Sequence, residues 1–470
     1  MSRTWTISNV EEYQYGKPPP IWWSVLAIVV IQIGGILIAV LTWPQGKPVM
    51  SELFFARALL LPMLVSGAVC GVIYSGYEDW IERVDWWNFM CRSERAAWRR
   101  WAQAHVVIVN SVTLTPEPEL AERLLELEGN VPMHPGKILA LPESGDGSVG
   151  GSRLGRILEQ LVTPFAASLS RHAPRRAVDV ILQSTDKGDL TELRAVWRKL
   201  DLPDLVQFEW VPFGAQQTNI EAWFQDNRQA DFRLLLSCQL HSEGEEPAWS
   251  EAAVAMLVTS PRVVESFKGK LRPQARLFRP ISMPSDSVLD ALETLLAAEQ
   301  TPRTRIRHVW LSDLPPQGRH AALGAVKETG LELPAHDVDR AIGKPGPVNA
   351  LLLQALAAQM VAHGQGAQLV ATPDAHKVRL NLVGTQLAPV PRVEAGYMRL
   401  LSLSVTVGGS CCLLMIMIAL NALSASTGWF WACLAGFALL FLIQIGGSVL
   451  RRRLLEDDFY RQLWRMGART

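Results

Sequence analysis

The sequence predicts an α/β domain held between two pairs of membrane-spanning helices. Four uncharged apolar runs lie in two pairs, one pair towards each end of the 470-residue chain. Between the pairs, short apolar runs typical of buried strands alternate with helical patterns. In composition, 49% of the residues are hydrophobic and 45 basic residues balance 45 acidic ones. This composition excludes a disordered chain and argues against general nucleic-acid binding.

The four apolar runs are long enough to cross a membrane as helices. They comprise residues 21–43, 58–77, 400–423 and 428–450. Each reaches the roughly 20 residues needed to cross a ~30 Å hydrocarbon core, and the alternative is a buried helix of a soluble protein. We predict one transmembrane hairpin over residues 21–77 and a second over residues 400–450. Because the runs contain no acidic residue and no histidine, they are typical of an anchor and not of an ion pathway.

The basic residues that flank the apolar runs predict an orientation. Arginines are frequent after the second run and after the fourth, whereas the short loop inside each hairpin carries few basic residues or none. Positive residues accumulate on the cytoplasmic side of a membrane. We therefore expect the N-terminal segment 1–20, the large domain and the basic tail 451–470 to be cytoplasmic.

A repeated pentapeptide suggests how the spans pack. IQIGG occurs in the first run and again in the fourth, and small residues also recur in the second run. Small residues let helix backbones approach closely, and an amide side chain can hydrogen-bond between helices. The predicted packing residues are Gln32, Gly34, Gly35, Gly67, Gly71, Gln444, Gly446 and Gly447.

The segment after the second run, residues 78–104, is rich in tryptophan and arginine. Such a helix can lie on the cytoplasmic leaflet, with tryptophan in the interface and arginine on phosphates. A buried connector between the membrane helices and the domain is the alternative. The sequence leaves both interpretations open.

Residues 105–384 are predicted to form the α/β domain, and residues 385–399 a linker. The expected strands are residues 106–109, 177–183, 206–211, 232–238, part of 249–260, 307–311, 368–371 and 378–383. The expected helices are residues 117–127, 154–171, 189–200, 218–226, 287–298, 320–329 and 347–363. Continuous apolar strands between helices indicate a sheet that is buried on both faces.

The order of these elements suggests two similar halves and resembles the thiolase-like fold of β-ketoacyl synthases and thiolases. Three stretches carry the resemblance: HVVIVNSVTLTP from His105, residues 231–260, and AIGKPGPVNALLLQAL from Ala341. The last resembles the turn and helix of the family's "I-G-H-x-x-G-A-A-G" motif. The resemblance covers about residues 104–384 and implies a dimer. The rival fold is an open doubly wound α/β sheet.

The sequence departs from that family at its catalytic positions. The turn that would carry the nucleophilic cysteine contains Gln216 and Gln217 instead. Lys344 replaces the histidine of the "I-G-H" turn, and the second histidine would fall near Asp313. The nucleophile and both histidines are therefore absent together, and these four residues mark a site without the family's condensing chemistry.

Other chemistry has little support in the sequence. A GxGxxG motif over residues 145–150 lacks the acidic residue expected about 20 positions later in a dinucleotide site and is interpreted as a loop. The six cysteines form no CxxC pair, and the nine histidines show no metal-binding spacing. We expect no cofactor, no metal site and no nucleic-acid partner.

The resulting functional hypothesis is a membrane-anchored, non-catalytic adaptor with a pseudo-thiolase domain. The layout resembles bacterial inner-membrane proteins associated with type VI secretion, where accessory proteins deliver lipase effectors. The implied partners are membrane lipids, a cytoplasmic effector or component of the secretion machine, and a second copy of the chain. Two alternatives stay open: a membrane-bound enzyme on acyl or lipid substrates, with Cys238 or another residue as nucleophile, and a sensor that binds an acyl ligand.

Overall fold

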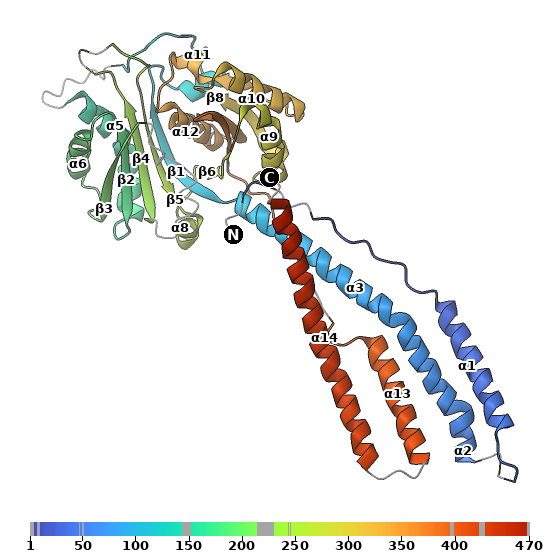
Figure 1. Ribbon diagram of the computed structural model, residues 1–470. Coiled ribbons are helices and arrows are strands. Elements are labelled where there is room, and N and C mark those ends of the chain that lie inside the picture. The colour runs from blue at the N-terminus through green and yellow to red at the C-terminus, as the bar shows by residue number, and fades with distance from the viewer. Residues whose placement is uncertain are drawn as a thin grey trace. The chain divides into compact units, whose positions relative to one another are not determined.

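The computed structural model describes the chain except residues 1–3, 7–9, 47, 49–50, 143–151, 214–229, 243, 245, 395–398, 423–427 and 468–470, and except the side chains of 421–422 and 466–467. The described chain divides into two compact units. The first comprises Met1–Trp5 and Trp98–Val390, and the second comprises Thr6–Ala97 and Pro391–Thr470. The α/β region and the apolar helices therefore belong to different units (Figure 1).

The first half of the α/β unit is a mixed five-stranded arrangement. Its strands are β1 (His105–Leu114), β2 (Val178–Ser184), β3 (Val206–Pro212), β4 (Phe232–Gln239) and β5 (Ala252–Thr259). They lie in the order β3-β2-β4-β5-β1. β2 is parallel to β3 and to β4, whereas β5 is antiparallel to both of its neighbours.

The second half repeats this topology. Its strands are β6 (Ala275–Phe278), β8 (Ile306–Leu311), β9 (Ala335–Asp337), β10 (Ala367–Asp374) and β11 (Lys377–Gly384), and the short β7 (Ile281–Met283) pairs with β11. The order β9-β8-β10-β11-β6 matches the first half strand for strand, with β11 in the antiparallel position of β5. An antiparallel pairing of β1 with β6 joins the halves into one 11-stranded sheet. Two similar halves are what the order of elements in the sequence predicts.

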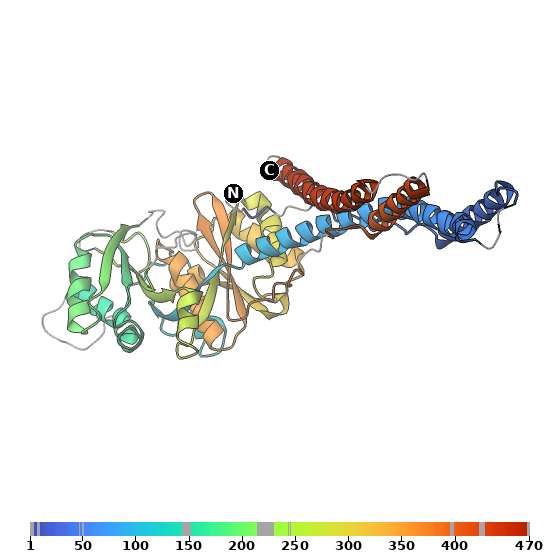
Figure 2. The ribbon, with the colours of Figure 1, turned by 90° about the horizontal axis from the view of Figure 1, so that it is seen from below.

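The helix α12 (Asn349–Ala362) forms the centre of the unit. Ten of its 14 residues are buried, and its core cluster includes residues of β1 and β5 from one half and of β8 and β10 from the other. A helix that is apolar on all sides is one that the fold buries on all sides. Figure 2 shows the green strands of the first half and the orange strands of the second as separate groups.

Amphipathic helices cover the outer faces of both halves. In the first half, α5 (Arg153–His172) and α6 (Asp189–Lys199) pack on β2 and β4. In the second half, α9 (Val288–Ala297) and α10 (Pro316–Glu328) pack on β8, β10 and β11. Each buried aliphatic side chain contributes about 1.5–3 kcal/mol to folding. In the described residues, α12 therefore packs between the two halves of the sheet, and these four amphipathic helices cover the outer faces of the two halves.

Shorter elements differ from the sequence prediction. The helix expected over residues 117–127 is only α4 (Leu120–Leu124), since Glu119 and Glu126 have φ of 49° and 57°, outside the right-handed helical region. The elements α8 (Pro261–Ser266), α11 (Val338–Ile342), β6, β7 and β9 were not predicted, because they are too short to carry a periodic signal. The helix expected over residues 218–226 lies outside the described residues.

The second unit contains four helices that are long and apolar enough to span a membrane. They are α1 (Ile21–Leu41), α3 (Leu61–Ala102) with the short α2 (Glu52–Phe55) and a π-helical turn (Ala56–Leu60) before it, α13 (Leu403–Ala422) and α14 (Gly428–Gly467). Both α3 and α14 continue well beyond their apolar runs as unbroken helices. The segment 78–104 is therefore the second part of α3 and not a separate element.

The polar part of α3 packs within its own unit. Trp86 and Trp87 are 4% and 2% exposed and belong to a cluster with Val10 and with Phe459 of α14. Tyr13 stacks on Trp87 with the ring centroids 4.8 Å apart, and the Trp87 Nε1 donates a hydrogen bond to the carbonyl of Glu11 over 3.0 Å. These contacts bury Trp86 and Trp87 among residues of the second unit.

Candidate functional site

Buried polar side chains from both halves meet at the first turn of α12. Gln239 ends β4, Ser250 precedes β5, Ser312 follows β8 and Asn349 begins α12, and each of them is about 1% exposed. Asn349 Nδ2 donates a hydrogen bond to Ser312 Oγ over 2.7 Å. Gln239 Oε1 accepts one from the amide of Val348 over 3.1 Å. This network, which we call the interhalf network, connects the strand ends of the two halves.

Lys344 belongs to this region through its backbone. Its amide donates to the carbonyl of Lys137 over 2.8 Å, and its carbonyl accepts from the amide of Ser250 over 3.0 Å. The preceding Gly343 has a φ of 88°, and a Cβ built there would lie 2.1 Å from the Lys137 carbonyl oxygen. Only glycine fits this conformation and this space. The turn is therefore fixed in the structure while the Lys344 side chain is exposed.

Asp313 lies beside a second carboxylate, that of Asp339 in α11. The Asp313 amide donates to Asp339 Oδ2 over 2.8 Å, and the Ser312 hydroxyl donates to Asp339 Oδ1. Burial raises the pKa of Asp339. Burial, together with the charge of Asp339, raises the pKa of Asp313 above 3.8. The Asp339 carboxylate thus accepts hydrogen bonds from the Asp313 backbone amide and the Ser312 hydroxyl, and the Asp313 carboxylate lies close enough to feel its charge.

The described residues of the interhalf network offer no activated nucleophile. Gln216 and Gln217 lie outside the described residues, as does the GxGxxG segment of residues 145–150. Ser312 is buried, donates to Asp339 and accepts from Asn349, so its hydroxyl is already occupied. Asp313 and Lys344 are joined to the network through backbone hydrogen bonds, and their side chains form no hydrogen bond or ion pair with each other in the described part of the chain.

Cys238 is also unsuited to nucleophilic chemistry. It lies within β4 and is 2% exposed, packed in the apolar core of the first half. Burial raises the pKa of its thiol to about 12, and the charge of Asp189 adds to this effect. Since the thiolate is the nucleophile, such a thiol is inert near neutral pH.

A cavity of about 510 Å³ lies elsewhere in the α/β unit. The end of β1, α4, the first turns of α5 and the end of α12 line it. Its polar lining residues are Thr113, Thr115, Glu119, Glu122, Arg153, Arg156, Gln160, Gln359 and His363. The size is within the range of about 300–1,000 Å³ that is usual for small-molecule sites. Sequence reasoning missed this cavity because its lining comes from segments that are far apart in the chain; the paired Arg153 and Arg156 were the only local signal.

Arg153, which lines this cavity, forms an ion pair with the buried Glu251. The Arg153 guanidinium donates to both carboxylate oxygens of Glu251 over 2.6 Å, and the Glu251 side chain has no exposed surface. The amides of Leu141 and His241 also donate to Glu251, over 2.7 and 2.8 Å. Burial alone would raise the pKa of Glu251, but the hydrogen bonds from Arg153, His241 and Leu141 lower it below 4.5.

Some predicted packing residues of the apolar helices make close contacts. A Cβ at Gly35 would lie 2.1 Å from Cγ of Pro62, and Gln32 Nε2 donates to the carbonyl of Ala58 over 3.1 Å. These contacts join α1 to the start of α3. Gly34 of the same pentapeptide has no atom within 4 Å of such a Cβ.

The remaining packing residues concern α3, α13 and α14. A Cβ at Gly67 would meet Cys411 Sγ at 2.6 Å, and one at Gly71 would meet the Ser404 carbonyl oxygen at 2.7 Å. Gln444 Oε1 accepts a hydrogen bond from the amide of Ser402 over 3.0 Å. A Cβ at either Gly446 or Gly447 would contact nothing within 4 Å. The two copies of the pentapeptide therefore lie in different surroundings.

No group of three histidine, cysteine, aspartate or glutamate side chains could hold a metal ion within the part of the chain that the structure describes. His308 and His336 are joined by a hydrogen bond of 3.0 Å between ring nitrogens.

Comparison with solved structures finds chains of similar course. A Streptomyces albus oxazolomycin ketosynthase domain is 11% identical, with 62% of this chain and 99% of that chain covered and a TM-score of 0.43. A type II polyketide ketosynthase in complex with its acyl-carrier protein is 9% identical over 60% and 99%, with a TM-score of 0.44. OleA of Xanthomonas campestris is 13% identical over 60% and 98%, with a TM-score of 0.37. No protein-family model and no curated protein matches this sequence. The mixed α/β sheet is thus similar in course to these ketosynthase-type structures.

Proposed function

We propose that this chain is a membrane-anchored adaptor whose α/β unit binds a protein partner without catalysing a reaction. The interhalf network is the observation that carries the proposal. The residue after β8 and the turn before α12 are engaged in structural hydrogen bonds: Ser312 bonds to Asp339 and Asn349, and Lys344 bonds through its backbone. Groups held in this way position elements and leave no free base or nucleophile in the described part of the network.

The enzymatic alternative relies on Cys238, and its environment argues against that role. A thiol within a buried strand, with a pKa of about 12, is protonated near neutral pH and closed to substrate. Ser237, the neighbouring hydroxyl, is fully buried and donates to Gln183 Oε1 over 3.0 Å. These observations support a fold that is used for binding.

The anchor follows from the four apolar helices. Their spans carry no charged residue, so they offer no ionisable group for transport, and the arginines that follow α3's and α14's apolar runs favour a cytoplasmic α/β unit in a bacterial inner membrane. The arrangement of an α/β unit between two pairs of apolar helices supports a partner from type VI secretion, either a secreted effector or a component of the secretion machine.

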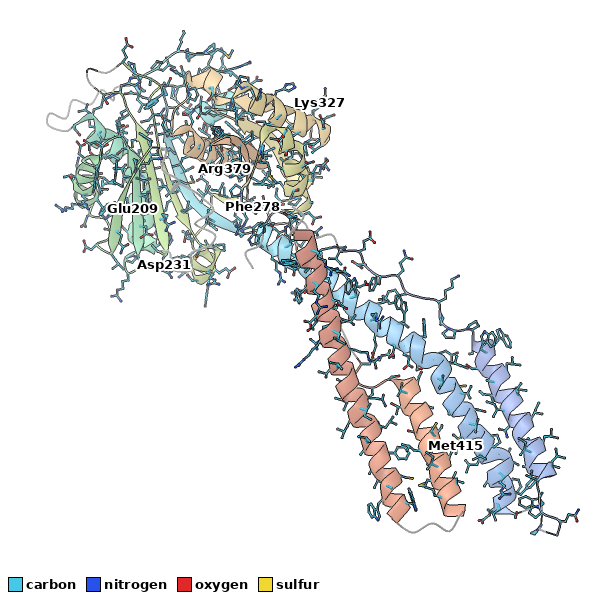
Figure 3. The ribbon with its side chains drawn as sticks, viewed as in Figure 1. Glu209, Asp231, Phe278, Lys327, Arg379 and Met415 are labelled. Carbon is cyan, nitrogen blue, oxygen red and sulfur yellow. The ribbon has the colours of Figure 1, made fainter. Side chains whose placement is uncertain are left out.

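A homodimer through β3 is part of the same proposal. In the described residues β3 lies at one end of the sheet and pairs only with β2, so its outer edge offers unpaired backbone groups. Glu209 of this strand is labelled in Figure 3. Analytical ultracentrifugation of the full chain in detergent tests this association; a monomer at all concentrations would contradict it.

A second candidate function is that of a ligand sensor. The cavity of about 510 Å³ is large enough for a small molecule and combines apolar residues such as Leu120 and Ile157 with two arginines. Extraction of the purified full chain followed by lipid mass spectrometry would reveal a bound acyl ligand. A cavity without a ligand leaves the adaptor as the better proposal.

The adaptor role is tested by affinity capture of the full-length chain from its native membrane in mild detergent. We expect recovery of one effector or secretion component in near-equal amount, and the same recovery with Cys238→Ala. Recovery of the chain alone would contradict the adaptor. A turnover of acyl substrate that Cys238→Ala abolishes would favour the enzyme instead.

A further inference from the structure

A groove of about 420 Å³ lies between α3 and α14 just past their apolar runs. Residues of one face of α14, spaced three or four apart from Arg451 to Arg465, form one wall. Residues of α3 from Asp79 to Trp87 form the other, and Tyr13 also lines the groove. The charged lining residues are Asp79, Glu82, Arg83, Arg451, Asp458, Arg461 and Arg465. We call this the juxtamembrane groove.

Two carboxylates of the groove form ion pairs with two of its arginines. Asp79 forms an ion pair with Arg451, and Asp458 forms one with Arg461 over 3.6 Å. Burial raises the pKa of Glu82 above 4.5, and the charge of Arg451 opposes this shift. Arg83 and Arg465 have no carboxylate within ion-pair distance among the described residues. Within the described part of the chain, these two guanidinium groups of the groove thus lack an ion-pair partner.

Arg83 lies at the depth of a phospholipid headgroup. The apolar run ends at Tyr77, and a rise of 1.5 Å per residue places the Cα of Arg83 about 9 Å beyond it. The headgroup layer extends about 5–8 Å from the hydrocarbon core, within reach of the long arginine side chain. Arg451 is the first residue past the apolar run of α14 and pairs with Asp79, one helical turn before Arg83 on α3. Trp80 is 38% exposed and has the position of an interfacial tryptophan. Arg465 lies about 22 Å past Leu450 and so lines the far end of the groove.

We propose that the membrane end of the juxtamembrane groove binds the phosphate group of an anionic phospholipid, with Arg83 as the principal ligand and with Arg451, which pairs with Asp79, one helical turn away. A guanidinium group donates paired hydrogen bonds to phosphate oxygens, a geometry that a lysine lacks. The inference rests on the membrane anchoring of the proposed function but not on its partner. A free phosphate has the same chemistry, and the position of Arg83 beside the apolar run favours the lipid.

The test uses the full-length chain in nanodiscs of phosphatidylcholine and phosphatidylglycerol in equal amounts, released for native mass spectrometry. We expect the wild type to retain phosphatidylglycerol in preference to phosphatidylcholine. Arg83→Gln removes a charge-assisted contact and should lower that retention roughly tenfold. Arg453→Gln is the matched control, because Arg453 lies two residues past Arg451 and is exposed outside the groove lining.

Three results would overturn the inference. The first is equal retention of both lipids by the wild type. The second is an equal loss of phosphatidylglycerol retention in Arg83→Gln and in Arg453→Gln. The third is displacement of phosphatidylglycerol by millimolar inorganic phosphate, which would assign the groove to a soluble anion. Thermal melting of both variants identifies any loss that comes from unfolding, and in that case Arg83→Lys replaces Arg83→Gln. If one of these results is found while Arg83→Gln still captures the protein partner, the lipid inference has failed and the proposed adaptor function has not.

Discussion

Asn349 donates a hydrogen bond from Nδ2 to Oγ of Ser312 over 2.7 Å and thereby joins the first residue of α12 to the residue that follows β8. Both side chains are 1% exposed. Asn349 Oδ1 also accepts the amide of Gly346 over 3.3 Å, so one side chain holds the turn of Lys344 and the loop of Asp313 together. These two loops are the ones that carry the expected pseudo-active-site residues in the second half.

Asn349→Ala should weaken this junction. The change removes the donor to Ser312 Oγ, which keeps its bond to Asp339, and leaves the buried Gly346 amide without its acceptor; such a loss costs about 1–3 kcal/mol. Native-state hydrogen exchange of the full chain should show faster exchange in β8 and α12. Lys344→Ala is the control, because its side chain is exposed and its backbone bonds stay. Equal exchange in both variants would show that the interhalf network has no structural role.

The fold was predictable where the sequence has a strong period or a continuous apolar run. β2, β4 and α12 were found for that reason. β9 was not, because the three residues Ala335–Asp337 are mostly polar and gain their strand character only by pairing with β8. The spans were predicted from hydropathy, but the continuity of α3 through its polar half depends on packing against α14 and the segment near Val10, which no local pattern records.

The candidate site was predictable only in part. Lys344 and Asp313 were singled out by resemblance to a family motif, while the residues that hydrogen-bond their backbones, Lys137, Ser250 and Asp339, were not. The pair of Arg153 and Glu251 is 98 residues apart in the chain, and the α/β cavity likewise depends on long-range contacts. Such pairs form by folding, so a single sequence does not reveal them.

Gly35→Ala should lower the melting temperature of the chain in detergent. The new Cβ would lie 2.1 Å from Pro62 Cγ, and overpacking of this kind costs about 1–3 kcal/mol. Gly34→Ala is the matched control: it meets no atom within 4 Å, and alanine favours a helix by about 1 kcal/mol over glycine. Thermal melting in one detergent measures both. A fall with Gly34→Ala as large as that with Gly35→Ala would contradict the α1 contact.

Glu251→Gln should destabilise the α/β unit by up to about 3 kcal/mol. Breaking a fully buried ion pair costs about 3–5 kcal/mol, and the cost here is at or below the lower end of that range because 36% of the Arg153 side chain is exposed. The folded-state pKa of Glu251 is lowered, so its contribution is fully present above pH 4.5 and is lost as the pH falls through the folded-state pKa. Denaturant titrations at several pH values measure this slope. Lys199→Gln breaks the exposed pair with Glu159 and should cost at most about 1 kcal/mol. A wild-type slope that is unchanged in Glu251→Gln would contradict the assignment.

The histidine pair of β8 and β9 should make the second half sensitive to mild acid. His308 Nδ1 and His336 Nε2 lie 3.0 Å apart, so one ring must accept, and a second proton would remove that acceptor. Burial lowers the pKa of His336 to about 4, with the His308 charge adding to this shift and a hydrogen bond with the Leu124 backbone opposing it. Burial and the nearby Arg307 lower the pKa of His308.

Because the folded state favours the neutral pair, its contribution to stability is fully present above pH 6.5 and is lost as the pH falls from 6.5 towards 4. Hydrogen exchange of β8 and β9, corrected for the intrinsic pH dependence, should therefore become faster over this range in the wild type. His336→Gln should flatten the dependence, since the group that gains a proton on unfolding is gone. His376→Gln changes an exposed histidine in the turn between β10 and β11 and should keep the wild-type slope. If His376→Gln flattened the slope as His336→Gln does, the acid sensitivity would not come from the pair.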